Sequence, residues 1–280
     1  MTASFWSLLI NFPSYVSTKM KLTLLDSLPF EARGELLRIA RGARIYDSSS
    51  SPEARVYFID RDGGYFVKRA ACGTLLREAR MGEYFYTLGL GAEVIGYESD
   101  EHDTLITRKV IGEDCTSEKY LKNPKKLCDT IAFALRELHE KDYTGCPVTD
   151  RTAEYLWTAH ENYRTGNYDS SHFPDSFGYT SAEAAIRVLS EGEGALKSDV
   201  LLHGDYCLPN IILNDWKLSG FIDLAGGGVG DRHIDLFWGA WTLWFNLGTD
   251  EYRERFFDAY GRDKVDEQIV KVIAAAEVFG

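Results

Sequence analysis

The feature that most constrains this chain is the stretch Leu201–Asp235, LLHGDYCLPNIILNDWKLSGFIDLAGGGVGDRHID. Short apolar runs alternate in it with polar loops and with an Asn-Asp turn signal, which predicts the order strand, loop, strand, turn, strand. The pattern places three polar residues at loop edges on one side of these strands. They are Asp205, Asn210 and Asp223.

These three residues suit phosphoryl transfer. That reaction needs one carboxylate to orient a hydroxyl group and accept its proton, and oxygen ligands to hold Mg²⁺ against nucleotide phosphates. Protein kinases carry His-Arg-Asp, four residues, Asn and then a second Asp. Here Asp205, Asn210 and Asp223 have the same order and the same first spacing, with Gly204 in place of the Arg. Each residue alone could simply cap a turn, but the three together favour a kinase.

Two segments of this stretch, HGDYCLPNI and LSGFIDLAGGGVGDRHIDL, closely resemble the aminoglycoside 3'-phosphotransferases. These are antibiotic kinases distantly related to protein kinases, and the similarity extends more loosely from about Lys21 to the C-terminus. The resemblance implies an α+β, two-lobed, protein-kinase-like fold. A small N-terminal lobe, residues 21–110, would hold an antiparallel five-stranded sheet and a helix, and a larger, mostly helical lobe, residues 111–280, would follow.

Composition narrows the range of partners. The chain has 280 residues, 45% of them hydrophobic, which is enough for a sizeable core. Its 43 acidic and 31 basic residues give a net charge of −12, which argues against nucleic acid and an anionic membrane as partners. A cationic small molecule would be attracted, although many proteins are this acidic. We expect a monomer or a weak dimer.

Five cysteines without a Cys-x-x-Cys pair indicate a reduced, cytoplasmic protein without a zinc site. Cys207 lies inside the central motif, but its neighbours match a kinase loop and no third residue orients a base for it, so we do not expect a catalytic thiol. Residues 1–20 are apolar but lack the basic opening of a secretory signal, and Asn11 with Pro13 interrupts them. We read them as an upstream extension, with Met20 as a candidate start.

The next part of the chain predicts one helix followed by a sheet. A helical pattern over residues 29–41 is followed by short β-branched or aromatic runs that turn signals separate. The runs cover residues 43–46, 56–59, 65–67, 92–97 and 104–110. The loop DSSSSPEAR joins the first two, and the resemblance implies that Ser51 contacts nucleotide phosphates there; an ordinary solvated hairpin loop is the alternative.

Lys68 follows the third run and ends the predicted strand, where a lysine on a sheet could neutralise charge on the α- and β-phosphates if a carboxylate held it. Glu78 lies on the next predicted helix, so the two resemble the lysine–glutamate pair of kinases. An isolated lysine at this position would otherwise be a solvated rim residue. The resemblance also implies that Phe66 stacks on adenine and that backbone groups of Arg108 and Val110, at a hinge between lobes, hydrogen-bond the base.

The larger lobe is expected to be helical, beginning with an amphipathic helix over residues 124–139. Its final residue, His139, is expected to pack or cap rather than to catalyse. A polar and aromatic loop, residues 162–179, falls where the family has an acid-rich substrate loop, so Asp169 and Asp175 are candidates to pair with a cationic substrate. Plain surface aspartates are the alternative. The resemblance implies that Asp231, Arg232 and Asp235 are structural polar anchors beneath the active-site loops.

The predicted mechanism places ATP, or GTP, in the cleft between the lobes. Lys68 neutralises charge on the phosphates, and Asn210 with Asp223 holds Mg²⁺. Asp205 positions and deprotonates a substrate hydroxyl, and the γ-phosphoryl group passes in line to it. No covalent enzyme intermediate is needed.

Substrate choice is less constrained than the reaction. Relatives bind the cationic antibiotic partly with an acidic pair, where this chain has Phe245 and Asn246. Relatives also end in an acidic-x-Phe tail that binds the drug, and Glu277 and Phe279 fit that pattern, with Gly280 added. The tryptophans that precede Phe245 fit an ordinary helix core, or else a more apolar substrate wall.

Two other functions stay open at this point. A kinase for another small molecule, such as a viomycin-type peptide, a macrolide, choline or homoserine, would share every catalytic residue named above. A non-catalytic nucleotide-binding pseudokinase is a binding-module alternative. Retention of all four catalytic and metal-binding side chains disfavours it; they are Lys68, Asp205, Asn210 and Asp223.

Overall fold

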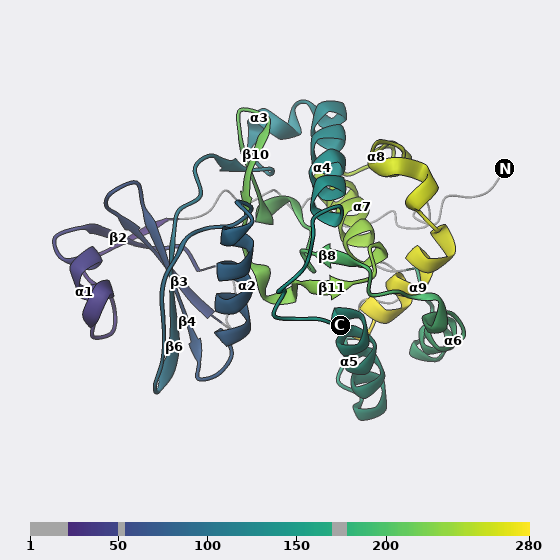
Figure 1. The fold of residues 1–280 in the computed structure, drawn as a ribbon, viewed down its shortest axis with the longest axis horizontal. Helices are drawn as coiled ribbons and strands as arrows, with labels where there is room; N and C mark the ends of the chain where they lie inside the picture. Colours follow the sequence, from purple (N-terminus) through teal and green to yellow (C-terminus); the bar gives the residue numbers. More distant parts are fainter. Residues whose placement is uncertain (1–21, 50–53, 170–177) are drawn as a thin grey trace. The chain divides into compact units, whose positions relative to one another are not determined.

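The computed structural model describes residues 22–49, 54–169 and 178–280. They divide into two compact units (Figure 1). The N-terminal unit takes the described residues as far as Ser117 together with Pro209–Gly226. The helical unit takes Glu118–Leu208 and Gly227–Gly280. Within the described ranges, no helix is both long and apolar enough to cross a membrane.

The N-terminal unit is built on an antiparallel sheet of six strands, in the order β1-β2-β3-β4-β6-β5. The expected number was five. The additional strand, β1, is a three-residue edge strand that pairs with β2, too short for an alternating pattern to reveal it. The bounds are Thr23–Leu25 (β1), Arg44–Asp47 (β2), Ala54–Asp60 (β3), Tyr65–Ala71 (β4), Val94–Ser99 (β5) and His102–Arg108 (β6).

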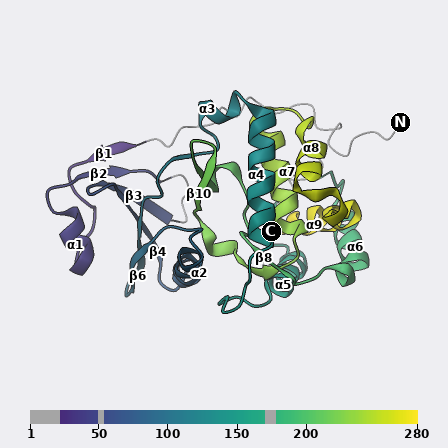
Figure 2. The ribbon, with the colours of Figure 1, turned by 45° about the horizontal axis from the view of Figure 1, so that its top comes forward.

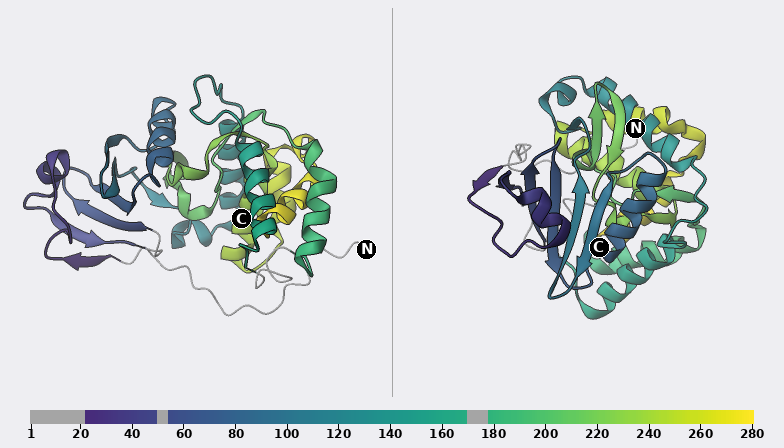
Figure 3. Two further views of the ribbon diagram at one scale, coloured as in Figure 1. Left: turned by 90° about the horizontal axis from the view of Figure 1, so that it is seen from below. Right: turned by 60° about the vertical axis from the view of Figure 1, so that its left-hand side comes forward.

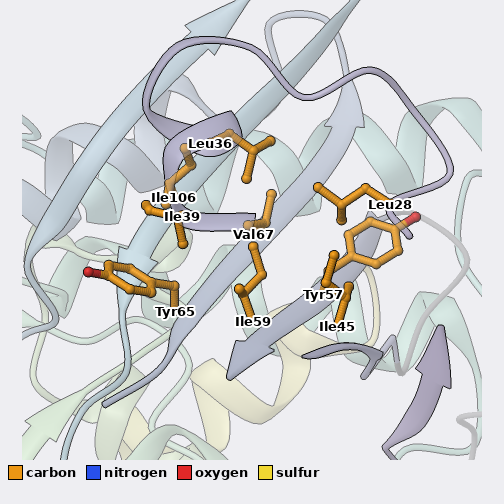
Figure 4. Close-up of a cluster of buried hydrophobic side chains, with 9 residues drawn as sticks. All are labelled: Leu28, Leu36, Ile39, Ile45, Tyr57, Ile59, Tyr65, Val67 and Ile106. Atoms are coloured by element: carbon orange, nitrogen blue, oxygen red, sulfur yellow. The ribbon is translucent and has the colours of Figure 1, made fainter. Parts of the chain in front are cut away.

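The two faces of this sheet follow the alternation of side chains along its strands. One face packs against α1, Gly34–Ala40, through an apolar cluster that includes Ile59, Val67 and Ile106 (Figure 4). The other face packs against α2, Leu76–Thr87, through Ala70 and Leu105 among others (Figure 3). Position 68 has the same parity as Ala70, so the strand directs Lys68 to the face that α2 covers.

A three-stranded sheet completes this unit, in the order β10-β9-β7. The central motif supplies β9, Ile211–Asn214, and β10, Lys217–Phe221, as the sequence predicted; β7 is the two-residue strand Glu113–Asp114. The turn between β9 and β10 has positive φ at Asp215 and Trp216, the backbone conformation of a tight two-residue hairpin. The hairpin brings its two ends together, where the Ile222 N–H donates a backbone hydrogen bond of 3.1 Å to the Asn210 carbonyl.

The helical unit packs α4, α7 and α8 side by side (Figure 2). The predicted helix over residues 124–139 has the same bounds in the structure, with Pro124 in its first turn. A two-stranded sheet joins β8, Val200–Leu202, to β11, Gly228–Gly230. The helices are Glu118–Leu121 (α3), Pro124–His139 (α4), Arg151–Thr165 (α5), Ala182–Gly192 (α6), His233–Leu247 (α7), Tyr252–Gly261 (α8) and Glu267–Glu277 (α9).

The glycines of β11 let the start of α5 approach closely. A Cβ atom on Gly228 would lie 2.6 Å from a methyl carbon of Val148, and one on Gly230 would lie 3.4 Å from Cβ of Arg151. The Val229 amide donates a hydrogen bond of 2.8 Å to the Val148 carbonyl. The glycine-rich part of the central motif therefore fixes the position of Arg151, the first residue of α5.

Candidate active site

Asp205 lies in a loop that a buried carboxylate holds from behind. Asp235, on the first turn of α7, accepts hydrogen bonds of 2.8 Å from the backbone N–H groups of both His203 and Gly204. The Asp205 amide donates in turn to Nδ1 of His203, at 3.2 Å. Gly204 has a φ of 83°, which a residue with a side chain rarely adopts. The loop geometry that presents Asp205 is therefore fixed by its neighbours on both sides.

A buried histidine completes the support of this loop. His139 Nε2 lies 3.2 Å from the same oxygen of Asp235 that accepts the His203 amide, and His139 Nδ1 lies 2.9 Å from the hydroxyl of Tyr260. Burial lowers the pKa of His139, so the ring is neutral and bridges its two partners. His139 therefore acts as a positioning residue, and Asp235 is the anchor that the sequence predicted. The helix pattern gave no signal for the bond to Tyr260.

Lys68 is held by two carboxylates in the N-terminal unit. Its Nζ lies 2.7 Å from Oε2 of Glu78 and 2.8 Å from Oδ1 of Asp223. Burial alone would lower the pKa of Lys68, but the charges of Glu78 and Asp223 outweigh it and hold that pKa above its usual value. The ammonium group is therefore a fixed positive charge, with the predicted carboxylate partner in place.

The helix that carries Glu78 is anchored by Asp103 in the neighbouring hairpin. The fully buried Asp103 carboxylate accepts hydrogen bonds from the backbone N–H groups of Gly73 and Leu75 and from the Ser99 hydroxyl, at 2.6 to 2.9 Å. Burial opposes its ionisation, but these donors outweigh burial and lower the pKa of Asp103 to about 2. A charged Asp103 thus holds the start of α2, and no motif in the sequence marked it.

Two side chains offer oxygen atoms to a metal ion in the N-terminal unit. Asn210 is 8% exposed and precedes β9; Asp223 is half-exposed, with a φ of 60°, two residues after the end of β10. The Ile222 amide donates to the Asn210 carbonyl at 3.1 Å, which ties the two loop edges together. Mg²⁺ prefers a few such oxygen ligands and keeps its remaining positions for water and phosphate. An amide and a carboxylate therefore fit this ion.

A cavity of about 230 Å³ in the helical unit is lined by Gly204 and Asp205. Its other polar lining residues include Arg151, Tyr155 and Glu277. One oxygen of Glu277 accepts hydrogen bonds from the Tyr155 hydroxyl, at 2.8 Å, and from the indole N–H of Trp238, at 2.9 Å. Burial raises the pKa of Glu277 to about 7, although these donors oppose the rise. The carboxyl group of Glu277 therefore lines the same cavity as Asp205, the predicted base.

Sequence comparison decides the family. The model of the phosphotransferase enzyme family matches residues 47–269. The chain belongs to this family. A probable aminoglycoside 3'-phosphotransferase of Lactococcus lactis subsp. lactis is 51% identical over 241 residues, which are 86% of this chain and 92% of that protein. An aminoglycoside 3'-phosphotransferase of Niallia circulans is 30% identical over 63% of this chain and 67% of its own length.

Solved structures agree with the assignment. An aminoglycoside-3'-phosphotransferase of type VIII superposes with a TM-score of 0.68 at 25% identity, over 85% of this chain and 94% of that one. The enzyme APH(3'')-Id of Streptomyces rimosus, in complex with ADP and streptomycin, has the same fold, with a TM-score of 0.67 at 24% identity over 80% of this chain and 90% of that one. The phosphotransferase therefore has the protein-kinase-like α+β fold that its central motif predicted.

Other predicted nucleotide-site residues of the phosphotransferase lie on or beside its six-stranded sheet. Phe66 on β4 packs against Phe58, with 5.2 Å between the ring centroids. The Arg108 side chain pairs with Glu93 at 2.9 Å, and the Arg108 backbone N–H donates to the Glu93 carbonyl, also at 2.9 Å, so this N–H is already engaged. Val110 lies two residues after the end of β6. The roles of Phe66, Arg108 and Val110 stay predictions, and Ser51 lies outside the described residues.

The predicted substrate residues are spread more widely. Phe279 is fully buried against Tyr163 and Tyr168, and the Asn162 side chain donates to its carbonyl at 2.7 Å. Asn246 donates to the Thr242 carbonyl at 2.8 Å. Neither Phe279 nor Asn246 lines the cavity described above, whereas Glu277 does. Asp169 is exposed, and Asp175 lies outside the described residues. These substrate roles stay predictions.

The thiol of Cys207 is unsuited to nucleophilic chemistry. Burial raises its pKa well above the usual range, and the neighbouring Asp205 carboxylate adds to the rise. The phosphotransferase would therefore keep this thiol protonated at neutral pH. This agrees with the expectation that Cys207 is not a catalytic nucleophile.

Proposed function

We propose that the phosphotransferase transfers the γ-phosphoryl group of ATP to the 3'-hydroxyl group of an aminoglycoside antibiotic and so confers resistance. The observation that carries this proposal is the cavity that Asp205 shares with Glu277, because it places a proton acceptor and a group that pairs with amines around one small-molecule site. The relatives named as aminoglycoside 3'-phosphotransferases support the choice of acceptor.

The nucleotide is assigned to the N-terminal unit. Lys68, held by Glu78, would neutralise charge on the α- and β-phosphates, as the strand lysine does in protein kinases. Asn210 and Asp223 would hold Mg²⁺, which would supply positive charge against the nucleotide phosphates. Displacement of the Asp223–Lys68 bond would free a carboxylate oxygen for that role. GTP would be held by the same side chains.

The acceptor is assigned to the helical unit, where Asp205 would take the proton of the reacting hydroxyl group. The hydroxyl oxygen then forms a bond to the γ-phosphorus while the bond from that phosphorus to the β,γ-bridging oxygen breaks. The electron pair of the broken bond stays with ADP. Because transfer is direct, the role of Asp205 is to orient the hydroxyl group and accept its proton.

Removal of the Asp205 carboxylate tests this assignment. Asp205→Ala should abolish turnover, by at least about a thousandfold, while ATP binding measured by calorimetry stays within a few-fold of the wild type. Trp157→Phe is the matched control, because this side chain is 68% exposed on α5 and has no role in the proposal. A near-normal rate in Asp205→Ala would remove Asp205 as the base.

Resistance profiling tests the acceptor class. Expression in a sensitive bacterium should raise the inhibitory concentrations of kanamycin and neomycin, and the Asp205→Ala variant should not raise them. Resistance to viomycin or to a macrolide instead would assign another acceptor to the same catalytic residues. We also propose a cytoplasmic protein that is monomeric or weakly dimeric, which gel filtration with light scattering would test.

A further inference from the structure

Helix α7 carries few polar side chains beyond its first turn. After Asp235 its residues are apolar except for Thr242 and Asn246, apart from the indole N–H groups of its tryptophans. Thr242 is fully buried. Threonine is a weak helix former, and a buried hydroxyl group costs free energy unless it is hydrogen-bonded. The role of Thr242 should therefore lie in the hydrogen bonds that it makes.

The Thr242 hydroxyl group holds the backbone of the loop that presents Asp205. Its oxygen accepts a hydrogen bond of 3.1 Å from the backbone N–H group of Leu208, three residues after Asp205. Leu208 is fully buried, so the bond is shielded from water. A methyl group in place of the hydroxyl would deprive this buried N–H group of its acceptor, which is costly inside a protein.

Helix α7 therefore holds this loop on both sides of Asp205. The Asp235 carboxylate accepts the two backbone N–H groups directly before Asp205, and Thr242 accepts the N–H group of Leu208 after it. Asp235 and Thr242 are seven residues apart, which is two helical turns, so their side chains project from the same face of α7. One helix face thus fixes both ends of the loop.

The chain between these two anchors is short and tightly turned. The Cys207 N–H group donates a hydrogen bond of 2.8 Å to the Asp205 carbonyl, which closes a three-residue turn. Burial raises the pKa of the Cys207 thiol, the Asp205 carboxylate adds to the rise, and the Thr242 hydroxyl group opposes it. Cys207 therefore lies within reach of both groups, and a shift of the backbone at Leu208 would pass to Asp205.

Asn246 supports Thr242 from the next turn of α7. Its side-chain amide donates to the Thr242 carbonyl at 2.8 Å and to the Thr242 hydroxyl oxygen at 3.2 Å. An amide nitrogen carries two hydrogens, so it can make both bonds. The Thr242 oxygen thus accepts from the Asn246 side chain as well as from the Leu208 backbone. The Asn246 amide is engaged with its own helix, and Asn246 does not line the cavity that contains Asp205.

Building on the proposed function, we infer that Thr242 and Asn246 are positioning residues for phosphoryl transfer. Thr242 holds the backbone that follows Asp205, and Asn246 acts on the reaction through Thr242 rather than by binding the acceptor. Together they keep the Asp205 carboxylate in the orientation that takes the proton of the reacting hydroxyl group. Their loss lowers kcat and leaves the KM values for acceptor and ATP unchanged.

Steady-state kinetics with kanamycin A and ATP test the role of Thr242. Thr242→Val keeps the shape of the side chain without the hydroxyl group, so kcat should fall about tenfold while both KM values stay within about twofold. Thr242→Ser keeps a hydroxyl group and should stay within about threefold of the wild type. Thr87→Val, which removes an exposed hydroxyl group hydrogen-bonded within α2, is the matched control and should match the wild type. An unchanged kcat in Thr242→Val, or an equal loss in Thr242→Ser, would overturn the inference.

A double-mutant cycle tests whether Asn246 acts through Thr242. Asn246→Ala should lower kcat about threefold with the KM for kanamycin A unchanged. The double variant with Thr242→Val should lose about tenfold in total, as Thr242→Val does alone, whereas independent effects would multiply to about thirtyfold. A multiplied loss would overturn the inference. So would a raised KM with an unchanged kcat in Asn246→Ala, which would make Asn246 an acceptor ligand.

Amide hydrogen exchange, followed by NMR, tests the hold on the loop without any acceptor. In Thr242→Val the Leu208 amide should exchange at least about tenfold faster than in the wild type, while the amides of His203 and Gly204, which Asp235 holds, should change by less than about threefold. Exchange of the Leu208 amide at the wild-type rate would overturn the inference. Failure of the wild type to phosphorylate any aminoglycoside would instead refute the proposed function, and the exchange rates would still decide whether Thr242 holds the loop.

Discussion

The protonation of Glu277 predicts how, and by how much, the free energy of unfolding depends on pH. Its pKa rises from the ordinary 4.5 to about 7 because the carboxyl group is buried. In the unfolded chain this group loses its proton near pH 4.5, whereas the folded protein keeps the proton to about pH 7. Between these values the folded state binds more protons than the unfolded state, so this group makes the free energy of unfolding fall as pH rises.

The size of that fall follows from the shift. A difference of about 2.5 pKa units, at 1.36 kcal/mol each, corresponds to about 3 kcal/mol. Glu277→Gln cannot ionise and can still accept hydrogen bonds from Tyr155 and Trp238, so it should lose this pH dependence. The free energy of unfolding of the wild type, relative to that of the variant, should therefore fall by about 3 kcal/mol from pH 4.5 to pH 8.

Urea denaturation at a series of pH values, without acceptor or nucleotide, measures this difference. Glu137→Gln, at an exposed residue of α4, shows the change caused by removing a surface carboxylate. If the free energies of unfolding of the wild type and Glu277→Gln changed in parallel with pH across this range, the reasoning would be refuted. They would mean that Glu277 ionises as readily in the folded protein as in the unfolded chain.

Three further predictions concern groups that hold the site. Lys68→Met should lower kcat by about a hundredfold or more and weaken ATP binding, because it removes the fixed positive charge. Glu78→Gln should have a milder effect in the same steady-state assay. Equal effects would argue against Glu78 as a partner that only positions Lys68. Asp235→Asn cannot accept from both backbone amides and should lower kcat and cost about 1–3 kcal/mol of stability, measured by denaturation, with ATP affinity unchanged; an unaltered kcat would mean that the loop does not need this anchor. Asp103→Asn should destabilise α2. Because the pKa of Asp103 is lowered to about 2, the wild type should have the higher free energy of unfolding above pH 4, and this difference should fade as pH falls towards 2. A difference that persists at pH 2 would contradict the charged anchor.

Much of the fold could be predicted from local patterns in the sequence. The apolar spacing and Pro124 gave the bounds of α4, and the Asn-Asp turn gave the β9–β10 hairpin, because each of these signals lies within a few residues of the element that it defines. The Lys68–Glu78 pair was also predicted, since kinases place the two groups on adjacent elements. Such features need no knowledge of distant contacts.

Contacts between distant segments could not be predicted in this way. The Tyr155 and Trp238 side chains reach Glu277 from helices far away in the sequence, and Tyr260 reaches His139 across 121 residues. Asp103 reads as one more polar residue in a hairpin until the backbone amides it binds are seen. These partners decide which polar groups are buried and charged, and only the folded chain brings them together.

The most direct test of the central claim uses kanamycin B and tobramycin, which differ by the 3'-hydroxyl group that tobramycin lacks. Purified wild-type protein with ATP and Mg²⁺ is incubated with each antibiotic, and the product is analysed by mass spectrometry and phosphorus NMR. The account predicts a monophosphorylated kanamycin B and no phosphorylated tobramycin. Equal phosphorylation of both antibiotics, or phosphorylation of neither, would contradict it.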